Sequence, residues 1–353
     1  MPTPLYEYRY AASRFGGPIA LIRDETLLLE VGSAYDPSQS VHIAASNGKV
    51  CGKFPWRESV VEGGRGSGVL SAKVRSKGRL VGFGWTSALI LLCVDDTGSV
   101  FQYDAQGELL HSHFSALSKY KSSASNPFED EPSEADSNGH SGDLELVVTH
   151  CQVWDEGVVV VATEKDAATG QEVARRCFSL LSSSTNAIES GFMQVEELRC
   201  PDLDQGKIHS LCVAEPLTSI SGKLEVFLAV GDHIWVADAQ SCEMQTTGDK
   251  GPFPKMSLCP NGQLLAAITC QGELLVVSTD FDQWLTEFQT HKEDELGPDQ
   301  VVWCGVDSVV IRWDEEVVMV GPFGDSIAYA YDDSVILVSS LVEWLFSAMR
   351  SPN

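Results

Sequence analysis

The chain has 353 residues, of which 43% are hydrophobic, and a formal net charge of −26. This length allows a large buried core, whereas so negative a charge argues against nucleic acid and anionic lipid as partners. No stretch approaches the roughly 20 consecutive apolar residues of a membrane span. We therefore expect no direct membrane insertion and mainly protein partners.

The N-terminal part divides into a short lead-in and the start of the main domain. Residues 1–13 lack the apolar region of a secretory signal and are predicted to be a lead-in. The glycine-rich stretch at residues 63–68 matches neither of the common phosphate-binding patterns and does not precede a predicted helix. We interpret it as a flexible hairpin loop.

One pattern of short apolar strands and Gly, Asp or Asn turns recurs along the chain. Its copies are residues 80–109, 149–177, 224–242, 255–284 and 300–325. Each copy reads as three or four strands joined by hairpin-type turns. Recurrence at about 40 residues is typical of a β-propeller. We predict an all-β propeller over residues 14–340, incomplete and with six to seven blades; a β-sandwich is the alternative, which the recurrence disfavours.

Residues 119–143 break this rhythm, because they are acidic, rich in Ser and almost free of apolar side chains. Such a segment is predicted to be a disordered loop between blades. It contains Asn126, Pro127 and Phe128, which resemble the Asn-Pro-Phe peptides bound by EH domains of endocytic adaptors. An Asn-Pro turn that presents a single apolar anchor fits such a peptide motif.

The end of the chain, residues 341–353, is predicted to be a divergent C-terminal tail. Its apolar residues, Leu341, Trp344, Leu345 and Met349, fall at a spacing that favours a helix.

The candidate chemical groups favour structural roles. Cys304 and His291 could form a thiol nucleophile and its base, but Cys304 lies in an apolar strand where a buried thiol is favoured. The ten cysteines include no closely spaced pair, so free thiols in a reducing cytosol are expected rather than disulfides or a zinc site. His111 and His113 share one face of a strand without a third ligand, which favours a solvent-facing strand end over a metal site.

Aspartates recur at predicted turns, where Asp side chains bond to the backbone. They are Asp95, Asp96, Asp155, Asp232, Asp307 and Asp314, which we interpret as equivalent turn positions of successive blades. A catalytic pair would occur once rather than once per blade. We therefore predict no catalytic, metal-binding or cofactor-binding residues, and a protein that is not an enzyme.

Three groups of residues resemble the vacuolar protein sorting-associated protein 16 family, and among its members those of plants called vacuoleless. They are Gly16, Gly17 and Pro18 near the start, Trp85 in the middle, and Trp303, Trp313, Gly321, Pro322, Gly324 and Asp325 towards the end. The resemblance covers residues 14 to 338 in order. We expect these family-motif residues to have structural roles.

This resemblance implies an N-terminal propeller followed by a helical solenoid, in a subunit of the class C tethering complexes HOPS and CORVET. It also implies a cytoplasmic protein that lies peripherally on late endosomes and on the vacuole or lysosome. Other class C subunits are the expected partners. The first alternative is a generic WD-like propeller adaptor unrelated to vesicle traffic. The second is a propeller enzyme, which would need polar side chains that converge on the central channel of the propeller.

The sequence departs from the family pattern in three respects, which we interpret as a truncated form. It begins only shortly before the motif at residues 15–18, it diverges after residue 338, and it lacks the solenoid. Because the solenoid holds the Sec1/Munc18-type subunit in the family, we do not expect this chain alone to recruit that subunit.

Overall fold

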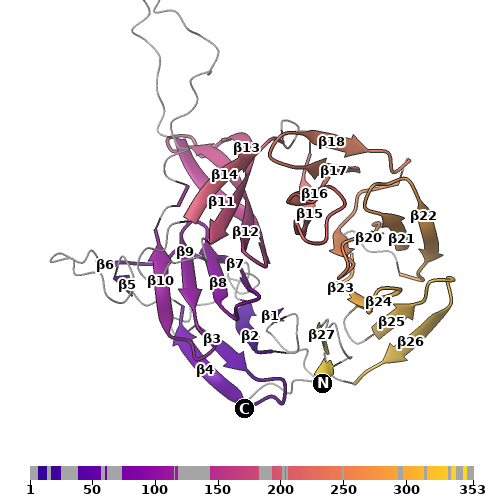
Figure 1. The fold of residues 1–353 in the computed structure, drawn as a ribbon, viewed down its shortest axis with the longest axis horizontal. Coiled ribbons are helices and arrows are strands. Elements are labelled where there is room, and N and C mark those ends of the chain that lie inside the picture. The colour runs from indigo at the N-terminus through magenta and orange to yellow at the C-terminus, as the bar shows by residue number, and fades with distance from the viewer. Residues whose placement is uncertain are drawn as a thin grey trace, which may run out of the picture.

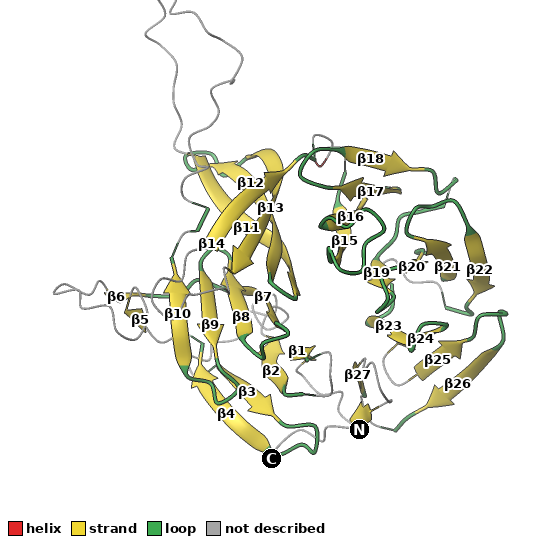
Figure 2. Ribbon diagram, in the orientation of Figure 1, coloured by secondary structure: helices red, strands yellow, loops and turns green. Residues whose placement is uncertain are grey.

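In the computed structural model, the regular secondary structure of the described residues consists of β-strands (Figure 2). The described residues are 7–13, 17–24, 39–56, 60–61, 74–114, 116–117, 144–182, 193–200, 203, 206–248, 250–292, 297–313, 316–332, 335–338 and 345–347. No helix among them has the length and apolar character that a membrane crossing requires. The predicted all-β fold class is confirmed.

Six antiparallel four-stranded sheets follow one another around a ring (Figure 1). Sheets 1 and 2 comprise β1 Glu7–Ala12, β2 Ile19–Asp24, β3 Ser40–Ala44, β4 Val50–Pro55, then β7 Leu80–Trp85, β8 Leu91–Asp95, β9 Val100–Tyr103 and β10 Leu109–His113. Sheets 3 and 4 comprise β11 Leu144–Trp154, β12 Gly157–Asp166, β13 Glu172–Ser182, β14 Met193–Leu198, then β15 Ile208–Ala214, β16 Glu225–Val230, β17 His233–Ala237 and β18 Cys242–Gln245. Sheets 5 and 6 comprise β19 Lys255–Leu258, β20 Leu264–Ile268, β21 Glu273–Ser278, β22 Trp284–Gln289, then β23 Gln300–Cys304, β24 Ser308–Trp313, β25 Glu316–Val320 and β26 Ser326–Ala330. Each sheet is one blade of a β-propeller.

A single turn geometry forms many of the hairpins. In the β8–β9 turn, Gly98 N donates to Asp95 O at 3.1 Å and Asp95 N donates to Ser99 O at 3.0 Å. Gly98 has a φ of +75°, a conformation that glycine adopts without steric cost. Asp95 Oδ1 accepts hydrogen bonds from the backbone N–H groups of Thr97 and Ser99. The Gly and Asp turn residues therefore fix where each strand ends.

The second strand of each sheet carries most of the core. All five residues of β8 are buried, as are the first eight of β12. Neighbouring sheets cover both faces of such a strand, which explains the continuous apolar runs in the sequence. Burial is therefore concentrated between blades rather than in one central core.

The first strands line the centre of the ring and contact one another in chain order, from β1 to β7, β11, β15, β19 and β23. The short strand β27 (Ile336–Val338) contacts β23 next, and it pairs with β28 (Leu345–Ser347). Sheet 7, as we call this pair, occupies the place of a seventh blade. The helix expected in the tail is wrong for residues 345–347, because pairing with β27 holds them in a strand; the rest of the tail lies outside the described residues.

Two further features refine the predicted boundaries. Strand β1 lies within the predicted lead-in and supplies the first strand of sheet 1, pairing with β2 along its whole length. The short strands β5 (Val60–Val61) and β6 (Val74–Arg75) pair on either side of the glycine-rich stretch, which itself lies outside the described residues.

Candidate functional site: a protein-contact face

Cys304 and His291, the pair considered as a thiol nucleophile and its base, each make contacts with other residues. His291 Nε2 lies 3.0 Å from Glu316 Oε1, and Lys292 Nζ lies 2.8 Å from the other oxygen of that carboxylate. Cys304 belongs to β23 and packs against the apolar cluster that contains Val310. Within the described residues, no group of three or more His, Cys, Asp or Glu side chains is arranged to hold a metal ion.

Three cysteines that are distant in sequence meet between sheets 3 and 4. The thiol of Cys200 interacts with those of Cys177 and Cys242, and the Cys177 contact, together with burial, raises the pKa of Cys200 well above its ordinary value. A raised pKa keeps the thiol protonated and weakly nucleophilic. No sequence pattern indicated this cluster, because its members are far apart in the chain. None of the ten cysteines is in a disulfide bond, and Cys51 is exposed.

The two histidines of β10 lie side by side with ring centroids 6.4 Å apart, on one face of the strand as predicted. The expected solvent-facing position is wrong for His113: its Nε2 is buried and has no hydrogen-bond partner among the described residues. Burial, with a smaller contribution from His111, lowers the pKa of His113 to about 4.

Asp95, Asp96 and Asp155 accept hydrogen bonds from backbone N–H groups, as predicted, but the turn aspartates do not occupy equivalent turns. Asp155 and Asp307 follow the first strands of their sheets, whereas Asp95, Asp96 and Asp232 follow second strands. Asp314 lies outside the described residues. The aspartates therefore lie at both ends of the blades.

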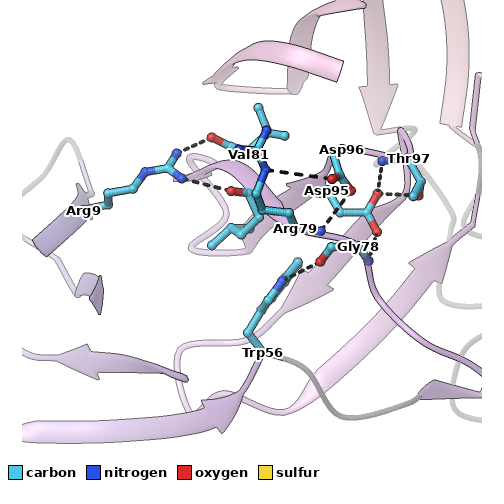
Figure 3. A network of polar contacts seen from close by, with 9 residues as sticks. Arg9, Trp56, Gly78, Arg79, Val81, Asp95, Asp96 and Thr97 are labelled. Carbon is cyan, nitrogen blue, oxygen red and sulfur yellow. Dashed lines mark hydrogen bonds and ion pairs between the residues drawn. The ribbon is translucent and has the colours of Figure 1, made fainter. Parts of the chain in front are cut away.

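Figure 3 shows that Asp95 and Asp96 hold sheet 2 to the segment that precedes it. Asp95 Oδ2 accepts from Gly78 N at 2.8 Å, and Asp96 Oδ1 accepts from Arg79 N at 2.9 Å. Trp56 Nε1 donates to Gly78 O at 3.0 Å, and Arg9 of β1 donates to the carbonyls at the start of β7. The network joins blades, so we assign these carboxylates a structural role.

Two family-motif tryptophans make the same contact between blades. Trp85 Nε1 donates to Ala11 O of β1 at 3.1 Å, and Trp303 Nε1 donates to Ser257 O of β19 at 2.9 Å. Each indole thus joins a first strand to the first strand of the preceding sheet. Trp313, at the end of β24, is buried and has Lys292 Nζ 5.7 Å from its ring.

The motif from Gly321 to Asp325 forms the β25–β26 turn. Gly321 N donates to Asp325 O at 2.8 Å, and a side chain at Gly321 would meet the Asp325 carboxylate at 2.7 Å. Gly324 has a φ of +75°, and Pro322 O accepts a hydrogen bond from Thr286 of sheet 5.

The motif near the start of the chain lies in the turn before β2. The backbone carbonyl of Pro18 accepts a hydrogen bond from Ser13 N, and a side chain at Gly17 would meet Ser13. Gly16, Asn126, Pro127 and Phe128 lie outside the described residues.

In each of the six four-stranded sheets a turn joins the first strand to the second, and the turns of successive sheets contact one another. Together the turns form one face of the ring, which we call the loop face. Its described residues are 13, 17–18, 86–90, 155–156, 215–224, 259–263 and 305–307. Ser87 N donates to Asp155 Oδ1 at 3.0 Å, and Asp155 N donates to Glu215 Oε1 at 3.1 Å. Thr218 packs against Gly262, and Cys259 Sγ donates to Val306 O at 3.7 Å. These contacts link five successive blades into one surface.

Large apolar side chains project from this face into solvent. Leu217 is 88% exposed and Ile220 is 61% exposed, and Leu89 and Val306 are also exposed. Glu156 and Asp307 are exposed beside them. Lys223 is exposed as well, but acidic residues outnumber it on this face, and apolar side chains among acidic ones suit a protein partner with apolar and basic residues.

Leu89 has a φ of 58°, in the left-handed region where glycine occupies the matching position of other hairpin turns. A leucine there is strained by about 1–2 kcal/mol. Strain retained at an exposed position points to a use for the side chain itself. Single leucines in loops carry no sequence signal, so sequence reasoning missed this face.

The ring of four-stranded sheets defines a β-propeller. Residues 2–342 match the family described as the N-terminal region of Vps16. The chain therefore belongs to the Vps16 N-terminal region family.

Two curated relatives agree with this membership. The chain is 28% identical over 346 residues to Protein VACUOLELESS1 of Arabidopsis thaliana, covering 94% of this chain and 34% of that protein. It is 24% identical over 338 residues to a vacuolar protein sorting-associated protein 16 homolog of Schizosaccharomyces pombe, covering 94% and 33%. The chain thus spans about a third of the length of these curated relatives. Among solved structures, the β-propeller domain of Cps50 (Swd1) from Myceliophteria thermophila gives a TM-score of 0.48 at 11% identity, covering 96% of this chain and 90% of that one.

Proposed function

We propose that the chain is a non-enzymatic propeller scaffold in vacuolar protein sorting, within a class C tethering complex of the HOPS or CORVET type. The observation that carries this proposal is the match to the Vps16 N-terminal region along nearly the whole chain. The names of the relatives, which refer to vacuolar protein sorting, support it.

The loop face gives this scaffold a means of binding. Its backbone is held by hydrogen bonds between blades, such as that from Ser87 N to Asp155 Oδ1. A rigid loop surface loses little conformational entropy when a partner binds. Its exposed apolar side chains supply contact area, and the partners we propose are other class C subunits.

The location we propose is the cytoplasmic side of late endosomes and of the vacuole or lysosome. Attachment there is peripheral and occurs through protein partners, since a net charge of −26 opposes direct binding to anionic lipid.

The Asn126-Pro127-Phe128 segment remains a second proposed contact, for an EH domain. A titration of a peptide of residues 120–137 against an EH domain tests it. Saturable binding that is lost when Phe128 is replaced by Ala supports the motif, and no binding at millimolar peptide rejects it.

Affinity purification of the tagged chain tests the proposed function. We expect class C subunits to co-purify, and to do so reproducibly above an unrelated propeller of similar charge. Recovery of other partners without any class C subunit would instead support a generic propeller adaptor and would reject the tethering role.

A further inference from the structure

The outermost strand of sheet 6, β26, differs from the outer strands of the other five sheets. All five of its residues are exposed, whereas none of them is charged or is a histidine. Four of the other outer strands contain charged residues, namely Lys53, Glu196, Glu197, Glu243 and Glu287, and β10 contains two histidines, His111 and His113. Charged residues on edge strands protect against pairing with another chain. Strand β26 lacks this protection.

The hydrogen-bonding groups of alternate β26 residues point away from the sheet. Gly321 N donates to Asp325 O, so the backbone groups of Gly321 face β26. Alternation along β25 then directs the groups of Met319 to β26, where its partner is Ile327. The N–H and C=O groups of Ser326, Ala328 and Ala330 consequently face outward. In the described part of the chain, no strand pairs with this edge.

An apolar side-chain surface accompanies this edge. Ile327 and Tyr329 pair with Met319 and Val317, which pack on the face of sheet 6 that contacts sheet 7. Ile327 is 52% exposed and Tyr329 is 43% exposed. A strand added beside β26 would therefore place alternate side chains against these two residues.

The chain segment that contains this edge is acidic, although Lys292 of the preceding segment pairs with one of its carboxylates, that of Glu316. Residues 313–338 contain six Asp or Glu residues and no Lys, Arg or His. Two of them, Asp325 and Asp332, are exposed at the two ends of β26. Antiparallel pairing of β26 with a second copy would bring these acidic ends together, which is unfavourable. A segment with basic ends would be attracted to both.

We propose that β26 is a strand-addition site for an extended segment of another protein, with alternating apolar residues and Lys or Arg at both ends. Main-chain hydrogen bonds to Ser326, Ala328 and Ala330 supply the binding, as in other cases of strand addition. Contacts with Ile327 and Tyr329 select for apolar residues in the segment. Asp325 and Asp332, at the two ends of β26, select for its basic ends. This site is separate from the loop face and does not depend on the proposed tethering function.

Hydrogen exchange on the full 353-residue chain tests the proposal, with the peptide Lys-Lys-Val-Thr-Val-Thr-Val-Lys-Lys as probe. At a peptide concentration of about ten times Kd, the outward amides of Ala328 and Ala330 should exchange about tenfold more slowly. The amides of Ile327 and Tyr329 already face β25 and should change little. A control peptide with Pro in place of the central Val cannot pair and should give no protection.

Two variants examine the same site. In Ala328→Pro the outward N–H is removed, so the chain should keep its own sheet but lose protection by the peptide. In Asp332→Lys, which leaves the backbone unchanged, the lysine-ended peptide should bind several-fold more weakly. Equal protection by the Pro-containing peptide, no change at Ala328 and Ala330, or protection that rises with protein concentration without peptide would overturn the proposal.

Discussion

The side chain of Gln300 holds the backbone of Leu337 through two hydrogen bonds. Gln300 Nε2 donates to Leu337 O at 3.0 Å, and Leu337 N donates to Gln300 Oε1 at 2.9 Å. Gln300 is only 6% exposed. One amide thus replaces the hydrogen bonds of a neighbouring strand and fixes sheet 7 to sheet 6.

Replacing Gln300 by Leu should lower the free energy of unfolding by about 2 to 4 kcal/mol, because it leaves two buried backbone groups of Leu337 without partners. Denaturant unfolding measures this loss, and the Leu337 amide should exchange faster. The exposed Gln289 also donates to backbone carbonyls. Gln289→Leu should therefore change the free energy by less than about 0.5 kcal/mol. Similar losses in both variants would show that the buried Gln300 contact has no special role.

The buried tryptophans should differ in their response to removal of the indole N–H. Trp85→Phe and Trp303→Phe should each lower the free energy of unfolding by about 1–2 kcal/mol, since each leaves a carbonyl of the preceding blade unpaired. Trp154 is equally buried, but its Nε1 has no hydrogen-bond partner among the described residues. Trp154→Phe removes no bond and should cost less than the other two. Thermal unfolding of the three variants side by side decides this, and a larger loss at Trp154 would contradict the assignment.

Leu89 should be dispensable for folding but required for partner binding. In Leu89→Gly and Leu89→Asn, both of which accept a left-handed φ, the strain is relieved and the free energy of unfolding should stay the same or rise by up to about 1 kcal/mol. Affinity for the proposed class C partner should fall, because an exposed apolar side chain is lost. Chemical unfolding and a binding titration measure the two effects. A loss of stability with unchanged affinity would assign Leu89 to packing alone.

His113 should make stability depend on pH below neutrality. Its pKa is lowered from 6.5 to about 4 in the folded chain, so the unfolded chain takes up the proton first as pH falls. The stabilisation is present above pH 6.5 and is lost towards pH 4, at up to about 1.4 kcal/mol per pH unit. Urea unfolding between pH 7 and pH 5 measures this slope, which should be flatter in His113→Gln. A slope in His113→Gln as steep as that of the wild type would reject the role of His113.

Much of the blade structure could be predicted from the sequence, because the turn residues carry it. The segment from Gln300 to Val320 forms three strands, and the predicted turn residue Asp307 lies between the first two. Glycine and aspartate have conformational preferences that do not depend on distant contacts. The alternation of apolar strands with such turns therefore predicts the propeller.

The features that escaped prediction depend on contacts between distant residues. Residues 345–347 have helical spacing but form a strand, because tertiary pairing with β27 overrides local preference. The partner of Gln300 lies 37 residues away along the chain. The loop face collects Leu89, Leu217 and Val306 from different blades, and only the ring brings them to one surface.

The affinity of the chain for the class C subunit that we propose as its partner tests the central claim most directly. The double variant Leu217→Ser, Ile220→Ser removes two exposed apolar side chains from the loop face and should raise the Kd by about tenfold or more. The matched control is Val173→Ser, at a side chain that is 57% exposed near the β12–β13 turn, away from the loop face. It should keep the wild-type Kd. A wild-type Kd for the double variant, or an equal loss in both, would contradict the account.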